Sequence, residues 1–78
     1  MPLSDRITLT ESGFLFDHSS GITYTLNGTG TAIMQMLLDA KGPEDIISEL
    51  MIRFEVEERD ARFDLDQFVS QIRKFNLI

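Results

Sequence analysis

The sequence has 78 residues, enough for one small domain, and its 42% hydrophobic and 26% charged content is typical of a globular protein. It contains no cysteine and one histidine, His18, which excludes a disulfide scaffold, a thiolate metal site and a zinc site built on several imidazoles. Thirteen acidic and seven basic residues give a net charge of −6, so a nucleic-acid backbone would repel the chain.

The sequence predicts neither a membrane span nor a secretory signal. No apolar run approaches the ~18 residues that a membrane span needs. Residues 1–6 lack the apolar core of a signal peptide. We therefore expect a cytoplasmic protein that binds neither membrane nor nucleic acid, and the length favours a binding module or a subunit over a large enzyme.

Residues 6–26 carry apolar side chains at alternate positions, which is the two-residue period of β-strands. Turn-forming residues at 11–13 and 17–21 divide this stretch into three runs. Short connections make neighbouring strands pair, so the pattern predicts a three-stranded antiparallel meander with the third strand, residues 22–26, at one edge.

From Asn27 onward the apolar period changes to three and four residues, which predicts helices. Asn27 is a good N-cap for a first helix that reaches about Ala40, where Lys41-Gly42 would close it. Gly28-Thr29-Gly30 opens this helix but lacks the spacing of a phosphate-binding loop. We interpret its small residues as allowing close packing against a neighbouring element.

A second helix is expected to begin at Pro43 and a third near Glu58. The buried stripe of the second helix is predicted to be Ile47, Leu50, Met51 and Phe54. The stripe of the third is predicted to be Ala61, Leu65, Phe68 and Ile72, together with Phe75 or Val69. Asn76 is expected in a left-handed cap that folds residues 77 and 78 back on the helix.

The predicted order of elements is β-β-β-α-α-α, an α+β fold in one domain that covers residues 1–78. One face of the sheet and one stripe of each helix share a single small core, so each large core residue matters. Met34, Met36, Leu38 and Met51 fit core filling better than an adaptable binding surface.

The residues that are candidates for chemistry fit structural roles better than catalytic ones. Asp17, His18 and Ser19 are neighbours in one turn, and such neighbours rarely point at a common atom as a catalytic triad requires. Six acidic residues between 55 and 66 lack the spacing of a calcium loop. They form a solvated helix face or a docking patch for a basic partner. We expect no enzyme activity, no metal ion and no cofactor.

The segment from Gly21 to Gly30, Gly-Ile-Thr-Tyr-Thr-Leu-Asn-Gly-Thr-Gly, resembles the PqqD-like family, also called the RiPP recognition element. Members of that family show a strand that ends in tyrosine-x-leucine-asparagine, followed by x-Thr-Gly and a helix. The resemblance continues through Ala32-Ile33, Leu37-Leu38, Ile46, Ile47, Leu50, Phe54, Val56, Asp64, Phe68, Leu77 and Ile78. It covers about residues 7–78. The sequence departs from the family at Asn76, where glycine is usual, and at Gly42-Pro43, where a threonine cap is commoner.

The resemblance implies a winged-helix-like fold and a non-catalytic chaperone that captures the leader segment of a ribosomally made precursor peptide. The leader would add as a strand beside the third strand and the third helix, for presentation to a maturation enzyme such as a radical SAM protein. The residues agree, because residues 22–26 contain no lysine, proline or charge that would protect a sheet edge. The expected peptide-binding residues are Ile22, Thr23, Tyr24, Thr25, Leu26, Leu65, Phe68, Val69 and Ile72.

Two other functions stay open at this point. A winged-helix DNA-binding regulator would need a basic third helix, whereas acidic residues crowd this one. An enzyme-docking subunit that binds no peptide would share the same fold. Whether the amides of Thr23 and Thr25 face the open edge or the second strand is also open. The sequence names neither the precursor peptide nor its modification.

Overall fold

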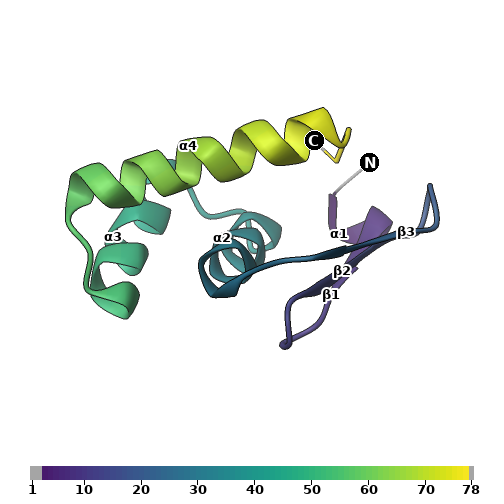
Figure 1. Ribbon diagram of the computed structural model, residues 1–78, viewed down its shortest axis with the longest axis horizontal. Helices are drawn as coiled ribbons and strands as arrows, with labels where there is room; N and C mark the ends of the chain where they lie inside the picture. Colours follow the sequence, from purple (N-terminus) through teal and green to yellow (C-terminus); the bar gives the residue numbers. More distant parts are fainter. Residues whose placement is uncertain (1–2, 78) are drawn as a thin grey trace.

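The computed structural model describes residues 3–77, in which a three-stranded sheet is followed by three helices (Figure 1). The strands are β1 (Ile7–Leu9), β2 (Phe14–Asp17) and β3 (Ile22–Thr25), and the helices are α2 (Gly28–Leu38), α3 (Pro43–Phe54) and α4 (Glu58–Lys74). A single helical turn, α1 (Leu3–Arg6), precedes the sheet and was not expected from the sequence. The predicted α+β, winged-helix-like order of a β-meander followed by three helices is confirmed.

The sheet is an antiparallel meander in the order β1-β2-β3, which leaves β3 at an edge. Leu15 of β2 lies opposite Leu9 of β1 and Tyr24 of β3, and its side chain is fully buried. Phe14 and Phe16 point to the other face and are 43% and 40% exposed. The face that carries Leu15 therefore covers the core.

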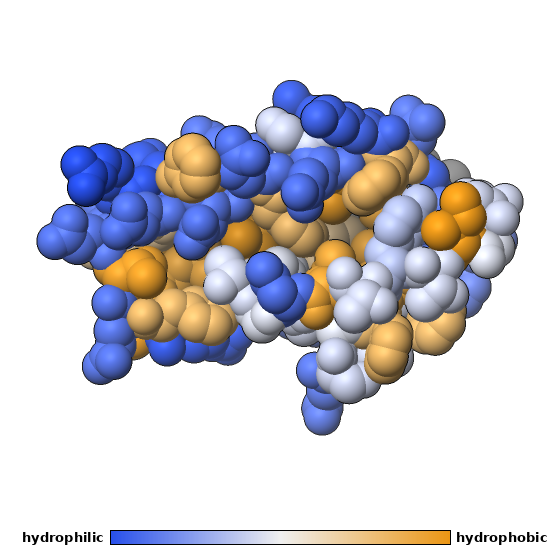
Figure 2. All heavy atoms as spheres, in the orientation of Figure 1, coloured by the Kyte–Doolittle hydropathy of each residue, from blue (hydrophilic) through white to orange (hydrophobic). Residues whose placement is uncertain are grey.

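Helix α2 lies between the sheet and the other two helices, since it contacts β1, α3 and α4. Helix α4 runs along the top of the view in Figure 1 and packs on α2 and α3. Figure 2 shows hydrophilic side chains along the outer side of α4 and apolar side chains in the seam beneath it. No helix within residues 3–77 is long and apolar enough to cross a membrane.

The core draws on the sheet and on all three long helices. Its largest fully buried side chains are Leu15, Ile33, Met34, Ile46, Leu50, Ile72 and Leu77. Met34 and Met36 are buried, so their predicted role as core filling is confirmed. The predicted stripe of α3 is partly wrong, because Met51 and Phe54 are only partly buried whereas Ile46 is 1% exposed.

The start of α2 agrees with the sequence, but its end does not. The Asn27 side chain accepts a hydrogen bond from the Gly30 amide at 2.7 Å, which is the predicted N-cap. The helix ends at Leu38, before the expected Ala40, because Ala40 takes the left-handed conformation with φ 59°. Gly42 does not close α2, and instead it is the N-cap position of α3, ahead of Pro43.

The end of α4 follows the prediction. Asn76 adopts the left-handed conformation with φ 58°, and the Leu77 amide donates to the Ile72 carbonyl at 2.9 Å. Leu77 is thereby folded back and is 1% exposed. The expectation for Ile78 falls outside the described residues.

The burial of Leu50 makes a prediction about stability. Replacing Leu50, which is 1% exposed, by alanine should lower the free energy of unfolding by about 2–5 kcal/mol, through lost burial and a new cavity. Ile52 lies two residues away and is 77% exposed, so Ile52→Ala should change it by less than about 0.5 kcal/mol. Urea unfolding of the two variants measures the difference, and equal midpoints would contradict this description of the core.

Candidate functional site

Alternate residues of β2 direct their backbone hydrogen bonds to opposite neighbours. The Phe14 carbonyl accepts from the Thr10 amide at 2.9 Å, toward β1. The adjacent Gly13 carbonyl accepts from the Leu26 amide at 2.8 Å, toward β3. Leu15 is two residues from Gly13, so its backbone groups also bond toward β3.

The same alternation determines which groups of β3 face outward. Tyr24 lies opposite Leu15, so the Tyr24 amide and carbonyl bond to β2. Thr23 and Thr25, on either side of Tyr24, therefore direct their amides and carbonyls to the open edge. Within the described sheet β3 has β2 as its only neighbour. The question left by the sequence is settled, since both threonine amides face the edge.

A hollow of about 320 Å³ lies between the end of β3, the first turns of α2 and one side of α4. Thr25 and Leu26 contribute to it from the sheet side, and Asn27, Thr29, Gly30 and Ile33 from the cap and body of α2. Helix α4 contributes Asp64, Gln67, Phe68 and Gln71. The hollow thus continues the open edge of β3 into a groove against α4.

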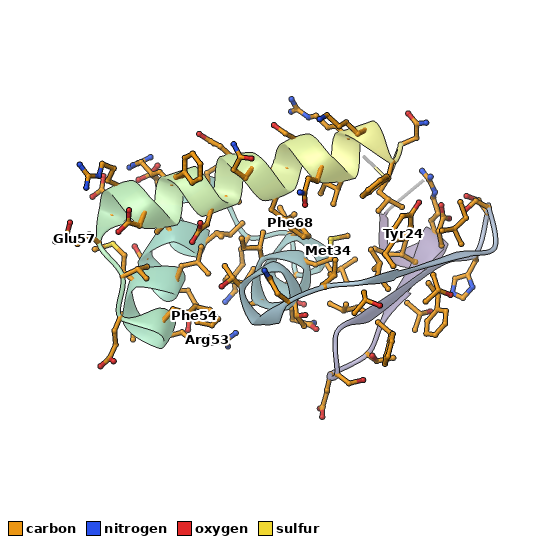
Figure 3. All side chains as sticks on the ribbon, viewed as in Figure 1. Tyr24, Met34, Arg53, Phe54, Glu57 and Phe68 are labelled. Carbon is orange, nitrogen blue, oxygen red and sulfur yellow. The ribbon has the colours of Figure 1, made fainter. Side chains whose placement is uncertain are left out.

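Close packing between α2 and α4 forms the floor of this groove. Phe68 points from α4 toward α2 (Figure 3), and a Cβ atom on Gly30 would lie 3.1 Å from the Phe68 ring. The same Cβ would lie 3.1 Å from the Oδ1 atom of Asn27. The predicted packing role of the small residues is therefore confirmed at Gly30. At Gly28 a Cβ would meet open space, so this role does not extend to Gly28.

Two aromatic rings contact each other between β3 and the C-terminal end of α4. Tyr24 of β3 and Phe75, which follows α4, have ring centroids 4.8 Å apart and planes tilted by 32°. Tyr24 is partly buried, whereas Phe75 remains 48% exposed. Figure 3 shows Tyr24 between the strands and the C-terminal end of α4. An extended segment added to β3 would therefore lie beside α4 between Asp64 and Phe75.

The family described as "Coenzyme PQQ synthesis protein D (PqqD)" matches residues 12–78. The chain belongs to the PqqD family. This match confirms the family resemblance of the sequence. No curated protein matches the chain.

Two solved structures share the fold of this PqqD-family chain. "Lasso peptide synthetase B1 complexed with the leader peptide" aligns with a TM-score of 0.74 at 35% identity, covering 87% of this chain and 81% of the other. "TbiB1 in Complex with the TbiA(beta) Leader Peptide" aligns with a TM-score of 0.82 at 22% identity, covering 99% and 93%. At 22% identity the second likeness concerns the fold alone.

The structure separates the site residues that the sequence predicts for this PqqD-family chain. Ile22, Thr23, Tyr24 and Thr25 form the edge strand, and Leu26 directly follows it. Phe68 lines the groove, and Ile72 is 2% exposed in the core. Leu65 and Val69 do not line the groove, because they face a second hollow with Leu37, Pro43 and Ile46.

Sequence reasoning missed the polar side of the groove. Asp64, Gln67 and Gln71 line it, spaced by three and four residues along one side of α4. That spacing was present in the sequence, but apolar periodicity selects the neighbouring core stripe instead. The sequence offers Phe75 for the core stripe, whereas the structure leaves it 48% exposed and in contact with Tyr24.

The turn before β3 is held by a buried carboxylate. Asp17 is 2% exposed and accepts hydrogen bonds from the Ser19 hydroxyl at 2.7 Å, the Ser19 amide at 3.0 Å and the Ser20 hydroxyl at 2.9 Å. Arg6 pairs with Asp17 at 3.4 Å and also donates to the Asn76 carbonyl. The Ser19 hydroxyl and then Arg6 hold the pKa of the Asp17 carboxyl well below its usual range.

This carboxylate should make stability depend on pH. A lowered pKa in the folded chain means that ionised Asp17 stabilises the fold above its ordinary pKa of 3.8, and that this contribution is lost as pH falls below that value. Asp17→Asn should therefore be less stable than the unchanged chain at pH 7, with the difference narrowing toward about pH 2. Urea unfolding across this pH range measures it. The control Asp66→Asn changes an exposed residue, and a pH-independent deficit in Asp17→Asn would contradict the assignment.

Proposed function

We propose that this chain captures the leader segment of a ribosomally made precursor peptide by β-strand addition to β3, and presents it to a modifying enzyme. The observation that carries the proposal is the free edge of β3, where the amides and carbonyls of Thr23 and Thr25 face outward. An extended peptide satisfies such groups with its own backbone, largely independently of its sequence. The 35% identical lasso peptide synthetase B1, whose structure is a complex with the leader peptide, supports a leader peptide as the ligand.

The groove beside α4 would supply the selectivity that backbone pairing lacks. Alternate side chains of an added strand point toward α4, where Phe68 and the exposed edge of Phe75 offer apolar contacts. Ile22 is 49% exposed and adds a further apolar contact at the start of the edge. Burial of several peptide side chains here is compatible with micromolar affinity, about −8 kcal/mol, after a disordered leader is ordered. The predicted contributions of Leu65 and Val69 would be indirect, through the packing of α4.

A role without catalysis fits the geometry of the one turn that resembles a catalytic cluster. The Ser19 hydroxyl donates to Asp17, and the His18 ring hydrogen-bonds Thr8 across the strands at 2.6 Å. A catalytic arrangement needs the histidine between the serine and the carboxylate. The turn instead uses its polar groups to hold the hairpin that leads into β3.

The other two functions are not favoured. A DNA-binding winged helix would place a basic helix in the groove of the duplex, whereas the four basic residues of α4 are balanced by four acidic ones, Glu58, Asp60, Asp64 and Asp66. A docking subunit without a peptide would have no use for an unprotected edge strand. The modifying enzyme, for which a radical SAM protein is one candidate, and the cytoplasmic location stay predictions.

Removal of one outward amide tests the proposal. Thr23→Pro lacks an amide that no described strand uses, and proline is tolerated on a sheet edge, so the chain should stay folded. The affinity of this variant for the peptide should fall about tenfold, because one backbone hydrogen bond is lost and the proline ring crowds the edge. The probe is a synthetic peptide selected on the unchanged chain from a library of random 12-residue sequences, and its affinity is measured by calorimetry.

Two further variants make the result decisive. Thr23→Val keeps the amide and the β-branched shape, so its affinity should match that of the unchanged chain. Tyr24→Pro removes an amide that bonds to β2 and should lose folding stability instead. Equal affinity of the folded Thr23→Pro and Thr23→Val variants would show that peptide does not pair with this edge.

A further inference from the structure

We propose that the groove selects peptides by the order of their charges, with a lysine or arginine beside Asp64 and an aspartate or glutamate about four residues later beside Lys74. This inference rests on the proposed function, because it concerns a strand already added to β3. It names the class of peptide that the site prefers.

The polar side of α4 carries a gradient of charge along the groove. Asp64, Gln67 and Gln71 line the groove in this order, and Lys74 lies three residues beyond Gln71, in the last turn of α4. The wall therefore begins with a carboxylate and continues with two amides, and an ammonium group follows them at the C-terminal end of α4. A peptide with the complementary order of charges would meet an opposite charge at each end.

The two charged groups of this line have no ion pair elsewhere in the described part of the chain. The ion pairs within residues 3–77 are Arg6 with Asp17, Arg53 with Glu49, and Arg62 with Glu44 and Glu58. Asp64 is the seventh residue of α4, beyond the first turn in which a carboxylate offsets the helix dipole. Its position on the groove wall therefore serves neither an ion pair within residues 3–77 nor the helix dipole. Lys74 lies in the last turn, where a cation also favours the helix.

The direction of the peptide follows from how β3 and α4 are arranged. Tyr24 contacts Phe75, beyond the end of α4, whereas Leu26, later in the chain, shares the hollow with Asp64. Strand and helix thus run in opposite directions. A peptide that pairs antiparallel with β3 runs in the direction of α4, so its earlier residues lie beside Asp64 and its later ones beside Lys74.

The spacing of the charges follows from the rise of each element. Asp64 and Lys74 are ten residues apart on α4, and ten residues of an α-helix rise about 15 Å along its axis. Residues on one face of a strand recur about every 6.8 Å, so about four residues span 13–14 Å. A separation of about two residues falls short, and one of about six overshoots by roughly 5 Å. The residue midway lies beside Gln67 and Gln71, whose amides both donate and accept hydrogen bonds.

A random-peptide selection on the full chain tests the inference without knowledge of the natural leader. A messenger-RNA-displayed library of random 12-residue peptides is selected at low salt on the unchanged chain, with Thr23→Pro as the counter-target to isolate edge-bound peptides. We expect Lys or Arg enriched about four positions before Asp or Glu. When the selection is repeated on Asp64→Lys, the first charged position of the peptides should change from Lys or Arg to Asp or Glu. The preference for Asp or Glu at the second charged position should stay the same.

Neighbouring residues on α4 supply matched controls. Asp66 and Arg73 line the second hollow, on the opposite side of the helix. Asp66→Lys changes the net charge as Asp64→Lys does, and Arg73→Glu changes it as Lys74→Glu does. A selected peptide should bind about fivefold more weakly to Asp64→Lys or Lys74→Glu, and about equally to the two controls. The difference in peptide affinity between the groove variants and the controls should shrink in 1 M salt, because salt screens the charges.

The outcomes separate this inference from the proposed function. Selected peptides that depend on the Thr23 amide but show no charge order, or the reverse order, would overturn the charge rule while strand addition stands. Equal losses of peptide affinity in Asp64→Lys and Asp66→Lys would mean that only the net charge matters, and this result would also overturn the charge rule. Failure to select any peptide that depends on the Thr23 amide would overturn both.

Discussion

An edge strand can bond a neighbour on one side only, and this constraint on β3 governs the whole site. Pairing with β2 uses the backbone of Tyr24 and leaves the amides and carbonyls of Thr23 and Thr25 facing outward. Many proteins cover or charge such an edge. Here α4 lies beside it without pairing, held in place by Phe68 against Gly30. The groove exists because core packing, rather than backbone pairing, positions the helix next to the strand.

The order of the strands and long helices, the start of α2 and the end of α4 could be predicted because the deciding interactions are local. Alternation in residues 6–26 and the Asn27 and Asn76 caps each depend on a few neighbouring residues. The buried face of the sheet is harder to predict, because residues 14, 15 and 16 are all apolar. Only packing against the helices decides that Leu15 is buried and that Phe14 and Phe16 are exposed. On α3, tertiary packing likewise buries Ile46 more fully than Met51 and Phe54, which the helical period alone selects.

The candidate site was only half predictable for the same reason. The strand side follows from position at an edge, but the helix side depends on how α4 is rotated about its axis. Leu65 and Val69 are apolar and therefore look like groove residues, yet they face the second hollow. Asp64 and Gln67 are polar and look solvated, yet they line the groove. The contacts of Arg6 with Asp17 and with the Asn76 carbonyl near the C-terminus are also non-local and have no signature in a sequence window.

Hydrogen exchange at single amides tests the central claim most directly. In the free protein the amides of Thr23 and Thr25 should exchange rapidly, whereas those of Tyr24 and Leu26, which bond to β2 and Gly13, should be protected. Addition of the precursor peptide should slow exchange at Thr23 and Thr25 and leave the already protected pair little changed. Protection of both threonine amides in the free chain, or new protection confined to α3 or to the turn at His18, would contradict strand addition at this edge.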